Sequence, residues 1–345
     1  MGHPEPPGGS PPQRPGSSDP VGVAQSSLNY RLKPAAVCSK VNGLRSEIDG
    51  LAAWLRLSAH ATTTSFTQEG RPLQTSTTMS AVPDVALARV MNLSAMVIGR
   101  LPTPSRSEVV YRSRVYIRTL RARECDWESH LDIHFAICNL LRIAAWKRLD
   151  FLSHEAHNSR ECIQIPGGVS LPEWYGVRTA LTGVSVPAWS ERDRFMFDYQ
   201  DIGKVGVRKW LQLAKRYARG LDPFVSLLDL EGATIDAGIA QLGIAFEAIG
   251  YELFQERGKS ENAANKKPVV DRVDLLVQDV SRTLSFQPST FGGRFAESYN
   301  SVKHANRPQI DPALKQEHFQ QGVELVRKWI AYRLGVSAQT LRSAG

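Results

Sequence analysis

Two polar residues near the end of the chain have the spacing of a catalytic pair. Asn300 and His304 lie four residues apart in the stretch YNSVKHANRP, and Pro308 ends it. Residues four apart share one face of a helix. Histidine is the side chain whose pKa best suits proton transfer near neutral pH. Lys303 and Arg307 add positive charges that can attract a phosphate. The stretch is therefore a candidate for acid–base chemistry on a phosphate ester.

The helix that carries this stretch is expected to span residues 294–303. At 100° per residue, one sector of about 60° is apolar or aromatic and forms the buried face: Phe295, Tyr299 and Val302. The opposite side faces solvent, another subunit or a substrate: Glu297, Asn300 and His304.

The surroundings of His304 leave two interpretations open. The end of a helix favours the imidazolium form, whereas the nearby Lys303 and Arg307 oppose it, so the pKa could lie near neutrality. A solvated helix end that merely carries polar residues has the same pattern. From geometry alone, a catalytic site and a solvated helix end both fit.

The elements that would position this stretch are helices. Three further segments after residue 230 place apolar residues three and four apart, which is the pattern of a helix with one buried face. The stripes are Ile235, Ile239, Leu242, Phe246, Ile249 and Leu253; then Val269, Val273, Leu276, Val280 and Leu284; then Phe319, Val323, Val326, Ile330 and Leu334. ERGKSENAANKKP is expected to be a polar connector. The last 110 or so residues are thus predicted to form a four-helix bundle.

The preceding part of the chain favours strands. Residues from about 40 to 122 contain short runs rich in β-branched residues, such as ATTTSFTQ and LQTSTTMSAV, with EGRP as a turn. They predict an antiparallel sheet or sandwich with polar residues on one face. Residues 126–146 predict a buried helix capped by Asp126, and residues 162–200 more sheet and loop. The fold class is α+β.

Composition divides the chain further. Residues 1–27 are rich in Pro, Gly and Ser and are expected to be a disordered leader. The expected domains are a β-rich domain at 28–229, a helical domain at 230–337 and a tail at 338–345. The chain of 345 residues, 42% hydrophobic and 22% charged, is typical of a globular protein. No apolar run approaches the roughly 20 residues of a membrane span, and no signal core is seen, so we expect a cytoplasmic protein without membrane contact.

Charge and cysteine content narrow the classes of partner. A net charge of +8 and a pI of about 9.4 favour phosphate-rich partners, although only weakly. The cysteines are scattered without a CxxC pair, which indicates reduced thiols and not a disulfide framework or zinc site: Cys38, Cys125, Cys138 and Cys162. No GxxxxGK[ST], GxGxxG or GxSxG motif is present, which argues against a nucleotide-hydrolysing motor and a serine hydrolase.

Other polar groupings each allow two readings. His130 and His134 lie four apart, with His154 and His157 nearby; they are core histidines or, less simply, ligands of a metal that lacks an evident further ligand. Glu47 and Asp49 form an acid pair, or they fix a turn or pair with Arg45 and Arg56.

The segment VGVRKWLQLAKRYARGL predicts a basic amphipathic helix that ends at Gly220 as its C-cap. Its aromatic residues Trp210 and Tyr217 either stack on nucleic-acid bases or lie in the core beneath a solvated basic face. The basic residues are Arg208, Lys209, Lys215, Arg216 and Arg219.

Several stretches together resemble a known family. YNSVKH is similar to the RNxxxH signature of HEPN domains, helical bundles that often act as ribonucleases. In order along the chain, VNGLRSEIDGLAAWLRL, DWESHLDIHFAICNLLRIAAW, DIGKVGVRKWLQLAKRYARGL, GIAFEAIGYEL and YNSVKHANRP resemble ApeA-like proteins. These are bacterial anti-phage factors with a β-rich N-terminal domain and a C-terminal HEPN domain. The likeness covers nearly the whole chain after residue 40.

The resemblance implies RNA cleavage without metal or cofactor, leaving a 2′,3′-cyclic phosphate. His304 would transfer protons, and Asn300 would be its polar partner. Tyr299 stands where the signature has arginine, so phosphate binding would pass to Lys303, Arg307 or Arg294. The implied partners are RNA, with tRNA among the targets, a second copy bound through the helical domain, and a phage-derived trigger. The alternative function is a non-catalytic module that binds RNA or senses a ligand in a defence system.

Overall fold

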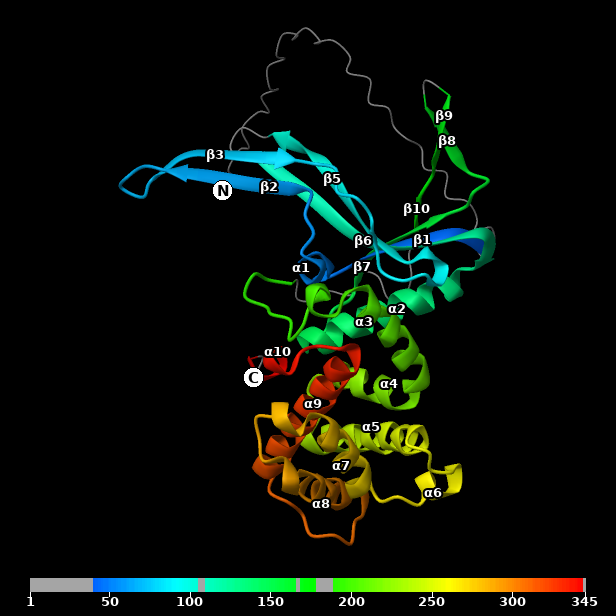
Figure 1. The fold of residues 1–345 in the computed structure, drawn as a ribbon, viewed down its shortest axis with the longest axis vertical. Coiled ribbons are helices and arrows are strands. Elements are labelled where there is room, and N and C mark those ends of the chain that lie inside the picture. The colour runs from blue at the N-terminus through cyan, green and yellow to red at the C-terminus, as the bar shows by residue number, and fades with distance from the viewer. Residues whose placement is uncertain (1–39, 105–108, 166–167, 178–188, 344–345) are drawn as a thin grey trace, which may run out of the picture. The chain divides into compact units, whose positions relative to one another are not determined.

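The first half of the described chain builds an antiparallel sheet (Figure 1). The computed structural model describes residues 40–104, 109–165, 168–177 and 189–343. Six strands pair in the order β10-β7-β1-β6-β5-β4. Their bounds are β1 (Lys40–Ile48), β4 (Val85–Ala86), β5 (Ser94–Pro104), β6 (Val109–Asp126), β7 (Phe151–His157) and β10 (Tyr175–Val177). The predicted β-rich region is confirmed, and in the described residues it forms one six-stranded sheet and two separate hairpins.

The two faces of this sheet differ as the alternation of strand residues requires. On β1, Leu44, Ser46 and Ile48 are buried, and helix α2 (Trp127–Ala145) packs against β1 and β6. The other face is polar, with an ion pair between Arg45 and Glu155. Asp126 is the N-cap of α2 as predicted by position, but its side chain makes no capping hydrogen bond.

Two hairpins lie outside this sheet. β2 (His60–Phe66) pairs with β3 (Pro72–Met79), and β8 (Cys162–Ile165) pairs with β9 (Val169–Pro172). The predicted EGRP turn joins β2 to β3, and Gly70 adopts a φ of 77° there. Cross-strand hydroxyl pairs such as Thr62 with Thr77, 3.1 Å apart, account for the threonine-rich sequence.

One prediction about the helices before residue 230 is wrong, namely where the basic helix ends. α1 (Leu51–Leu55) is a single short helix, whereas α3 (Tyr199–Arg216) starts at a capping box formed by Asp198 and Asp201. The basic helix does not end at Gly220. A new helix, α4 (Ala218–Ser226), runs through that position. Gly220 is buried, and a Cβ there would lie 2.6 Å from the Ile249 side chain, so its glycine permits close helix packing and not a C-cap.

The C-terminal region is helical, as predicted. Its four long helices carry the predicted apolar stripes: α5 (Ile235–Glu256), α7 (Val269–Val280), α8 (Phe291–Lys303) and α9 (Pro312–Leu334). α5 contacts the other three, and most stripe residues are buried. The polar connector contains a short helix not predicted from sequence, α6 (Glu261–Asn265), which Ser260 caps. α10 (Ala338–Ser343) lies in the segment predicted to be a tail.

One large hydrophobic cluster contains buried residues from both sides of residue 230. α9 contacts α2, and Arg327 donates hydrogen bonds from Nε to the Ile143 carbonyl (2.8 Å) and from Nη2 to the Ala144 carbonyl (2.9 Å). The boundary at 229/230 therefore lies within continuous packing and remains a proposal. The expected leader at 1–27 lies outside the described residues.

Two further observations concern the described residues only. None of the helices there is both long and apolar enough to cross a membrane. Three cysteines in that part of the chain are free thiols, namely Cys125, Cys138 and Cys162, while Cys38 lies outside it.

Candidate functional site

Helix α8 positions the candidate catalytic stretch. It starts at Phe291, three residues earlier than predicted, and its buried face packs against α5, α7 and α9. Phe295 lies edge-to-face against Phe246 of α5, with ring centroids 4.8 Å apart. These aromatic contacts fix the rotation of α8 about its axis, and thereby the direction in which its last turn faces.

Tyr299 points inward, as predicted. It is 5% exposed and lies against α5 at Gly243, where a Cβ would come within 2.2 Å of the tyrosine ring. Gly243 therefore makes the slot that Tyr299 fills. Burial and the nearby Glu247 carboxylate raise the pKa of Tyr299. The residue at the motif's arginine position is thus a packing residue.

α8 ends at Lys303 because His304 leaves the helical conformation. His304 has φ −124° and ψ 113°, and its N–H still donates to the Asn300 carbonyl at 3.0 Å. The predicted end of this helix at Lys303 is confirmed, and His304 is its C-cap, one turn after Asn300, with an extended backbone conformation. His304 is exposed as predicted, whereas Asn300 is half-buried.

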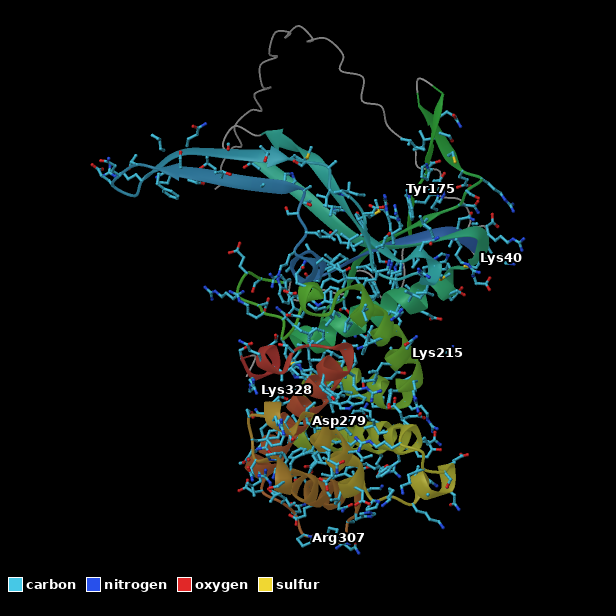
Figure 2. All side chains as sticks on the ribbon, in the orientation of Figure 1. Lys40, Tyr175, Lys215, Asp279, Arg307 and Lys328 are labelled. Atoms are coloured by element: carbon cyan, nitrogen blue, oxygen red, sulfur yellow. The ribbon has the colours of Figure 1, made fainter. Side chains whose placement is uncertain are left out.

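Two cations flank this imidazole. Lys303 directly precedes it, and Arg307 follows on the exposed loop after α8 (Figure 2). The Arg307 N–H donates to the His304 carbonyl at 3.0 Å, which holds the loop in a tight turn. Within the described residues, neither the His304 nor the Arg307 side chain makes a hydrogen bond or ion pair. Both remain accessible to a ligand.

Lys303 is partly committed to another partner. Its Nζ lies 3.3 Å from Glu247 Oε1 and 5.2 Å from the centroid of the Tyr299 ring. Burial works to lower the pKa of Lys303, but Glu247 and Tyr299 outweigh it, and the pKa is raised. Lys303 therefore stays charged, with part of that charge already balanced.

Arg294 occupies the other end of α8. Nine residues separate it from Lys303, which is about 13 Å along a helix. Its guanidinium lies 3.3 Å from Gln321 Oε1 and 3.5 Å from Glu317 Oε1 on α9. The structure thus brings together Lys303, His304 and Arg307, with Asn300 alongside, and does not bring Arg294 to them.

Sequence reasoning missed Glu247, because it considered only the apolar stripe of α5. A signal was present in the glycines of that helix, Gly243 and Gly250. Glycine in a helix interior is destabilising by about 1 kcal/mol relative to alanine, so it indicates that another element approaches closely. Glu247 lies one turn from Gly243, on the side where α8 approaches.

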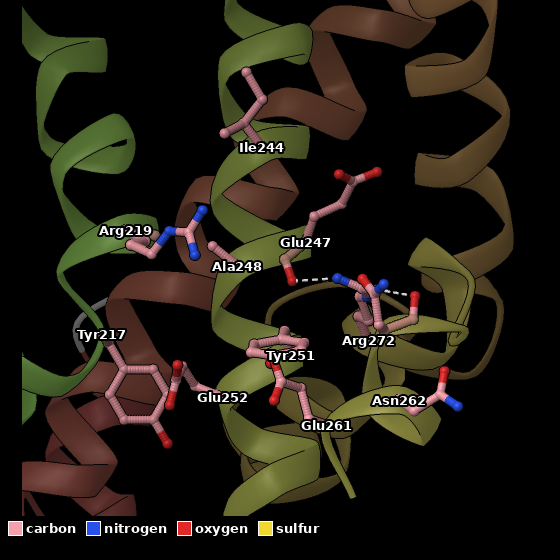
Figure 3. Close-up of a pocket in the computed structure, with 12 residues that line it drawn as sticks. Tyr217, Arg219, Ile244, Glu247, Ala248, Tyr251, Glu252, Glu261, Asn262 and Arg272 are labelled. Atoms are coloured by element: carbon pink, nitrogen blue, oxygen red, sulfur yellow. Dashed lines mark hydrogen bonds between the residues drawn. The ribbon is translucent and has the colours of Figure 1, made fainter.

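A pocket of about 720 Å³ opens beside Glu247 (Figure 3). It lies between α4, α5, α6 and the start of α7, and Glu247 contributes to its wall. The carbonyl of Glu247 accepts a hydrogen bond from Arg272 Nη1 at 2.6 Å. Glu247 of α5 therefore lines the pocket and also contacts Lys303 at the end of α8.

The histidines of the sheet region are core residues, one of the two readings above. Their hydrogen bonds form a chain in which Ser46 Oγ lies 2.7 Å from His154 Nδ1 and 2.6 Å from His134 Nδ1. Thr119 Oγ1 continues the chain, 3.0 Å from His134 Nε2 and 2.8 Å from His130 Nδ1. Burial lowers the pKa of all three histidines, that of His154 to about 4.

The geometry of this chain leaves little room for a shared ion. The Ser46 hydroxyl occupies the point on which two Nδ1 atoms converge. His157 lies apart from it, with Nδ1 2.9 Å from the Glu173 carbonyl. In the described ranges, no group of three or more His, Cys, Asp and Glu side chains could hold a metal ion. The three histidines therefore act as hydrogen-bonded neutral groups.

The predicted ion pairs of Glu47 and Asp49 are wrong. Arg45 pairs with Glu155, and Arg56 pairs with Asp198. Asp49 instead accepts a hydrogen bond from the backbone N–H of Trp189 at 2.9 Å, which fixes the chain next to a turn. Glu47 Oε2 lies 3.8 Å from Arg114. Both carboxylates have a structural role.

The basic helix has its aromatic residues in the core. Trp210 and Tyr217 are each 1% exposed, and Trp210 Nε1 donates to the Ala136 carbonyl at 2.6 Å. Base stacking on these two rings is therefore excluded. The basic residues remain on the exposed face, where Arg216 lies 3.5 Å from Glu252.

Comparison with known proteins assigns the first half of the chain. Residues 38–210 match the family model of ApeA N-terminal domain 1, which spans about half of the chain and ends within α3. No curated protein and no solved structure matches the chain. The described part of the matched segment contains the six-stranded sheet and its covering helix α2. The chain therefore belongs to the ApeA N-terminal domain 1 family, which associates it with defence.

Proposed function

We propose that the C-terminal region is a HEPN-type endoribonuclease that cleaves RNA without a metal ion, in anti-phage abortive infection. One observation carries the proposal. An exposed imidazole, His304, lies at the end of α8 between the cations Lys303 and Arg307, at the position of the HEPN histidine. The family assignment of the first half supports the role in defence.

In the proposed reaction, neutral His304 takes the proton from a ribose 2′-OH. The 2′-oxygen forms a bond to phosphorus while the bond from phosphorus to the 5′-oxygen breaks, and a 2′,3′-cyclic phosphate results. The imidazolium or water returns a proton to the leaving 5′-oxygen. Arg307 and Lys303 balance the negative charge that gathers on the phosphoryl oxygens. Asn300 donates to a phosphate oxygen.

The chain lacks the arginine of the RNxxxH signature, so another cation must bind the phosphate in this mechanism. Tyr299 fills a core slot and cannot reach a phosphate, so Arg307 is the guanidinium nearest to His304 in sequence. Loss of one charged contact to the transition state slows a reaction by about 100-fold. A second copy, packed against the exposed end of α8, would supply further cations.

The test is cleavage of purified tRNA and of total RNA by the full-length protein in EDTA, with phage lysate as the source of trigger. Wild type should yield fragments that end in a 2′,3′-cyclic phosphate. His304→Ala should yield none, and Lys303→Ala fewer. The exposed Arg282→Ala variant, far along the chain from His304, is the control and should cleave like wild type. Intact RNA in the wild-type reaction, under all of these conditions, rejects the proposal.

A second candidate function is RNA or ligand binding without cleavage, in which the sheet region acts as a sensor. It is favoured by the burial of Tyr299 and by the pairing of Lys303 with Glu247. This function predicts RNA binding by wild type and His304→Ala alike. Equal toxicity of the two proteins in cells would favour it over the ribonuclease.

A further inference from the structure

The pocket beside Glu247 has a fixed wall and several unused polar groups. Its volume of about 720 Å³ lies within the usual range of small-ligand sites. The wall is held by Arg272, which is 9% exposed and donates to four backbone carbonyls. Those carbonyls belong to Glu247, Ala264, Asn265 and Lys267. Arg272 thus ties α6 to α5, and the pocket between them is preformed.

Three polar side chains without a partner in the part of the chain that the structure describes line this pocket, and Figure 3 labels two of them, Arg219 and Asn262. The side chains of Arg219, Asn262 and Asn265 make no hydrogen bond or ion pair within the described residues. Ile244 is 47% exposed, and Tyr251 presents a half-buried ring about two turns farther along α5. These groups match the parts of a nucleotide. The guanidinium can bind its phosphate, the two carboxamides can bond to the edge of its base, and the apolar wall with the aromatic ring can contact the face of its base.

The acidic residues of the pocket restrict the ligand. Three carboxylates, Glu247, Glu252 and Glu261, oppose the two guanidinium groups of Arg219 and Arg272. The formal charge of the lining is therefore −1, and a triphosphate would be repelled. Carboxylates accept hydrogen bonds from the amino groups of bases. Because Arg272 is engaged with backbone carbonyls, Arg219 is the one guanidinium of the lining left for a phosphate, and this matches one base and one phosphate, as in a single unit of a nucleic-acid strand.

The pocket also adjoins the end of α8. The Glu247 carboxylate lies 3.3 Å from Lys303 Nζ, while the Glu247 carbonyl contacts Arg272 inside the pocket wall. We infer that the pocket holds one nucleotide of a single-stranded RNA, adjacent to the phosphate at His304, with the phosphate of that nucleotide on Arg219 and its base on Ile244 and Tyr251. This inference rests on the proposed function and adds where its substrate binds.

The test measures binding separately from cleavage. A fluorescein-labelled single-stranded RNA of about a dozen nucleotides is titrated with full-length protein in the His304→Ala background, and anisotropy is recorded. Arg219→Ala should weaken binding by about 5-fold and reduce the slope of log K against log salt by about 0.7, since one phosphate contact is lost. Ile244→Glu should weaken binding by about 10-fold or more. Both side chains are exposed, so the variants are expected to fold.

Arg282→Ala is the matched control, because it removes an exposed cation that makes no ion pair in the described residues and does not line the pocket. It should change the Kd by less than 2-fold. If Arg219→Ala and Ile244→Glu bind RNA as the control does, the inference is overturned, even where cleavage depends on His304. Adenosine monophosphate that fills the pocket without displacing RNA would also overturn it. Weakened binding in both variants, without cleavage by the otherwise wild-type protein, supports the pocket and rejects the ribonuclease.

Discussion

The histidines of the sheet region and the histidine at the end of α8 have opposite surroundings. His130 and His134 are four residues apart, as are Asn300 and His304, yet the first pair is fully buried and bonded to hydroxyls. His304 is exposed between two cations and has no side-chain partner in the described part of the chain. The same spacing of four residues thus occurs in a buried hydrogen-bond network in one region and at a candidate reactive histidine in the other. What differs is the packing around each ring.

The largest effects are expected when the exposed histidine and a buried histidine are each replaced. His304→Ala should reduce RNA cleavage by about 1000-fold, because general acid–base catalysis typically contributes factors of 100 to 10,000. Its free energy of unfolding should change by less than about 0.5 kcal/mol, since the side chain is exposed. Gel assays of cleavage and urea unfolding measure the two effects.

His154→Asn is the control for that experiment, because it alters a buried histidine and should lower stability while leaving cleavage unchanged at temperatures where the protein is folded. A strong loss of cleavage in folded His154→Asn would contradict the assignment of different roles to the two regions.

The next largest effect is expected on stability, when the slot at Gly243 that holds the Tyr299 ring is filled. Gly243→Ala places a Cβ 2.2 Å from the tyrosine ring, so α8 must shift or Tyr299 must leave the core. Overpacking of this kind should lower the free energy of unfolding by about 3 kcal/mol, which exceeds the roughly 1 kcal/mol gained in helix propensity. Urea unfolding measures the difference.

Gly293→Ala on α8 is the matched control. A Cβ there meets nothing within 4 Å, so this variant should gain up to about 1 kcal/mol. Equal effects of the two substitutions would show that Tyr299 is free to move, and the inward position of the ring would then not be fixed by packing.

Acid should destabilise the sheet region through its histidines. Burial lowers the pKa of His154 to about 4, below the value of about 6.5 expected in the unfolded chain. The unfolded state therefore binds the proton first as pH falls, and stability present above pH 6.5 is lost down to about pH 4. For this one group the loss should be about 2 kcal/mol at pH 5. Urea unfolding at pH 7.5 and pH 5 measures it.

His154→Asn should be less stable than wild type at pH 7.5 but should lose less on acidification, because asparagine does not titrate and can still bond to Ser46. A pH dependence as steep as that of wild type would show that other groups, with His134 the first to consider, carry the acid sensitivity.

The smallest expected effect concerns Lys303. Glu247→Gln removes the carboxylate that lies 3.3 Å from Lys303 Nζ, so the ammonium becomes available to phosphate. A partly exposed ion pair contributes about 0.2–1 kcal/mol, which corresponds to RNA binding up to about 5-fold tighter. Anisotropy with labelled RNA measures the change. Glu297→Gln, an exposed glutamate on α8, is the control, and weaker binding in Glu247→Gln would instead assign Glu247 the task of positioning Lys303.

Periodic features could be predicted from the sequence. The stripe from Ile239 to Leu253 is buried as expected, because the spacing of apolar residues alone determines which side of a helix avoids water. The same reasoning placed Tyr299 inside. The runs rich in β-branched residues predicted antiparallel strands. The choice between an open sheet and a sandwich depends on how distant segments pack.

Features that depend on contacts between distant segments could not be predicted. Gly220 has the residue type of a C-cap, but the close approach of α5 decides its role. The pairing of Glu247 with Lys303 joins residues 56 positions apart. The departure of His304 from helical geometry depends on the turn that Arg307 closes. No local pattern contains these contacts, so the sequence alone could not predict how the candidate residues are arranged.

The guanidinium of Arg327 has a consequence for anyone who wishes to separate the two halves of the chain. It lies on α9, yet it caps the carbonyls that end α2, and burial lowers its pKa to about 10. A break near residue 230 would part Arg327 from the Ile143 carbonyl and from the ring of Trp146, while the Ala144 carbonyl would still accept a hydrogen bond from the Met196 N–H. The helical half produced alone should therefore aggregate, and exchange of one half with that of a related protein should be tolerated only when Arg327 and the end of α2 come from the same protein.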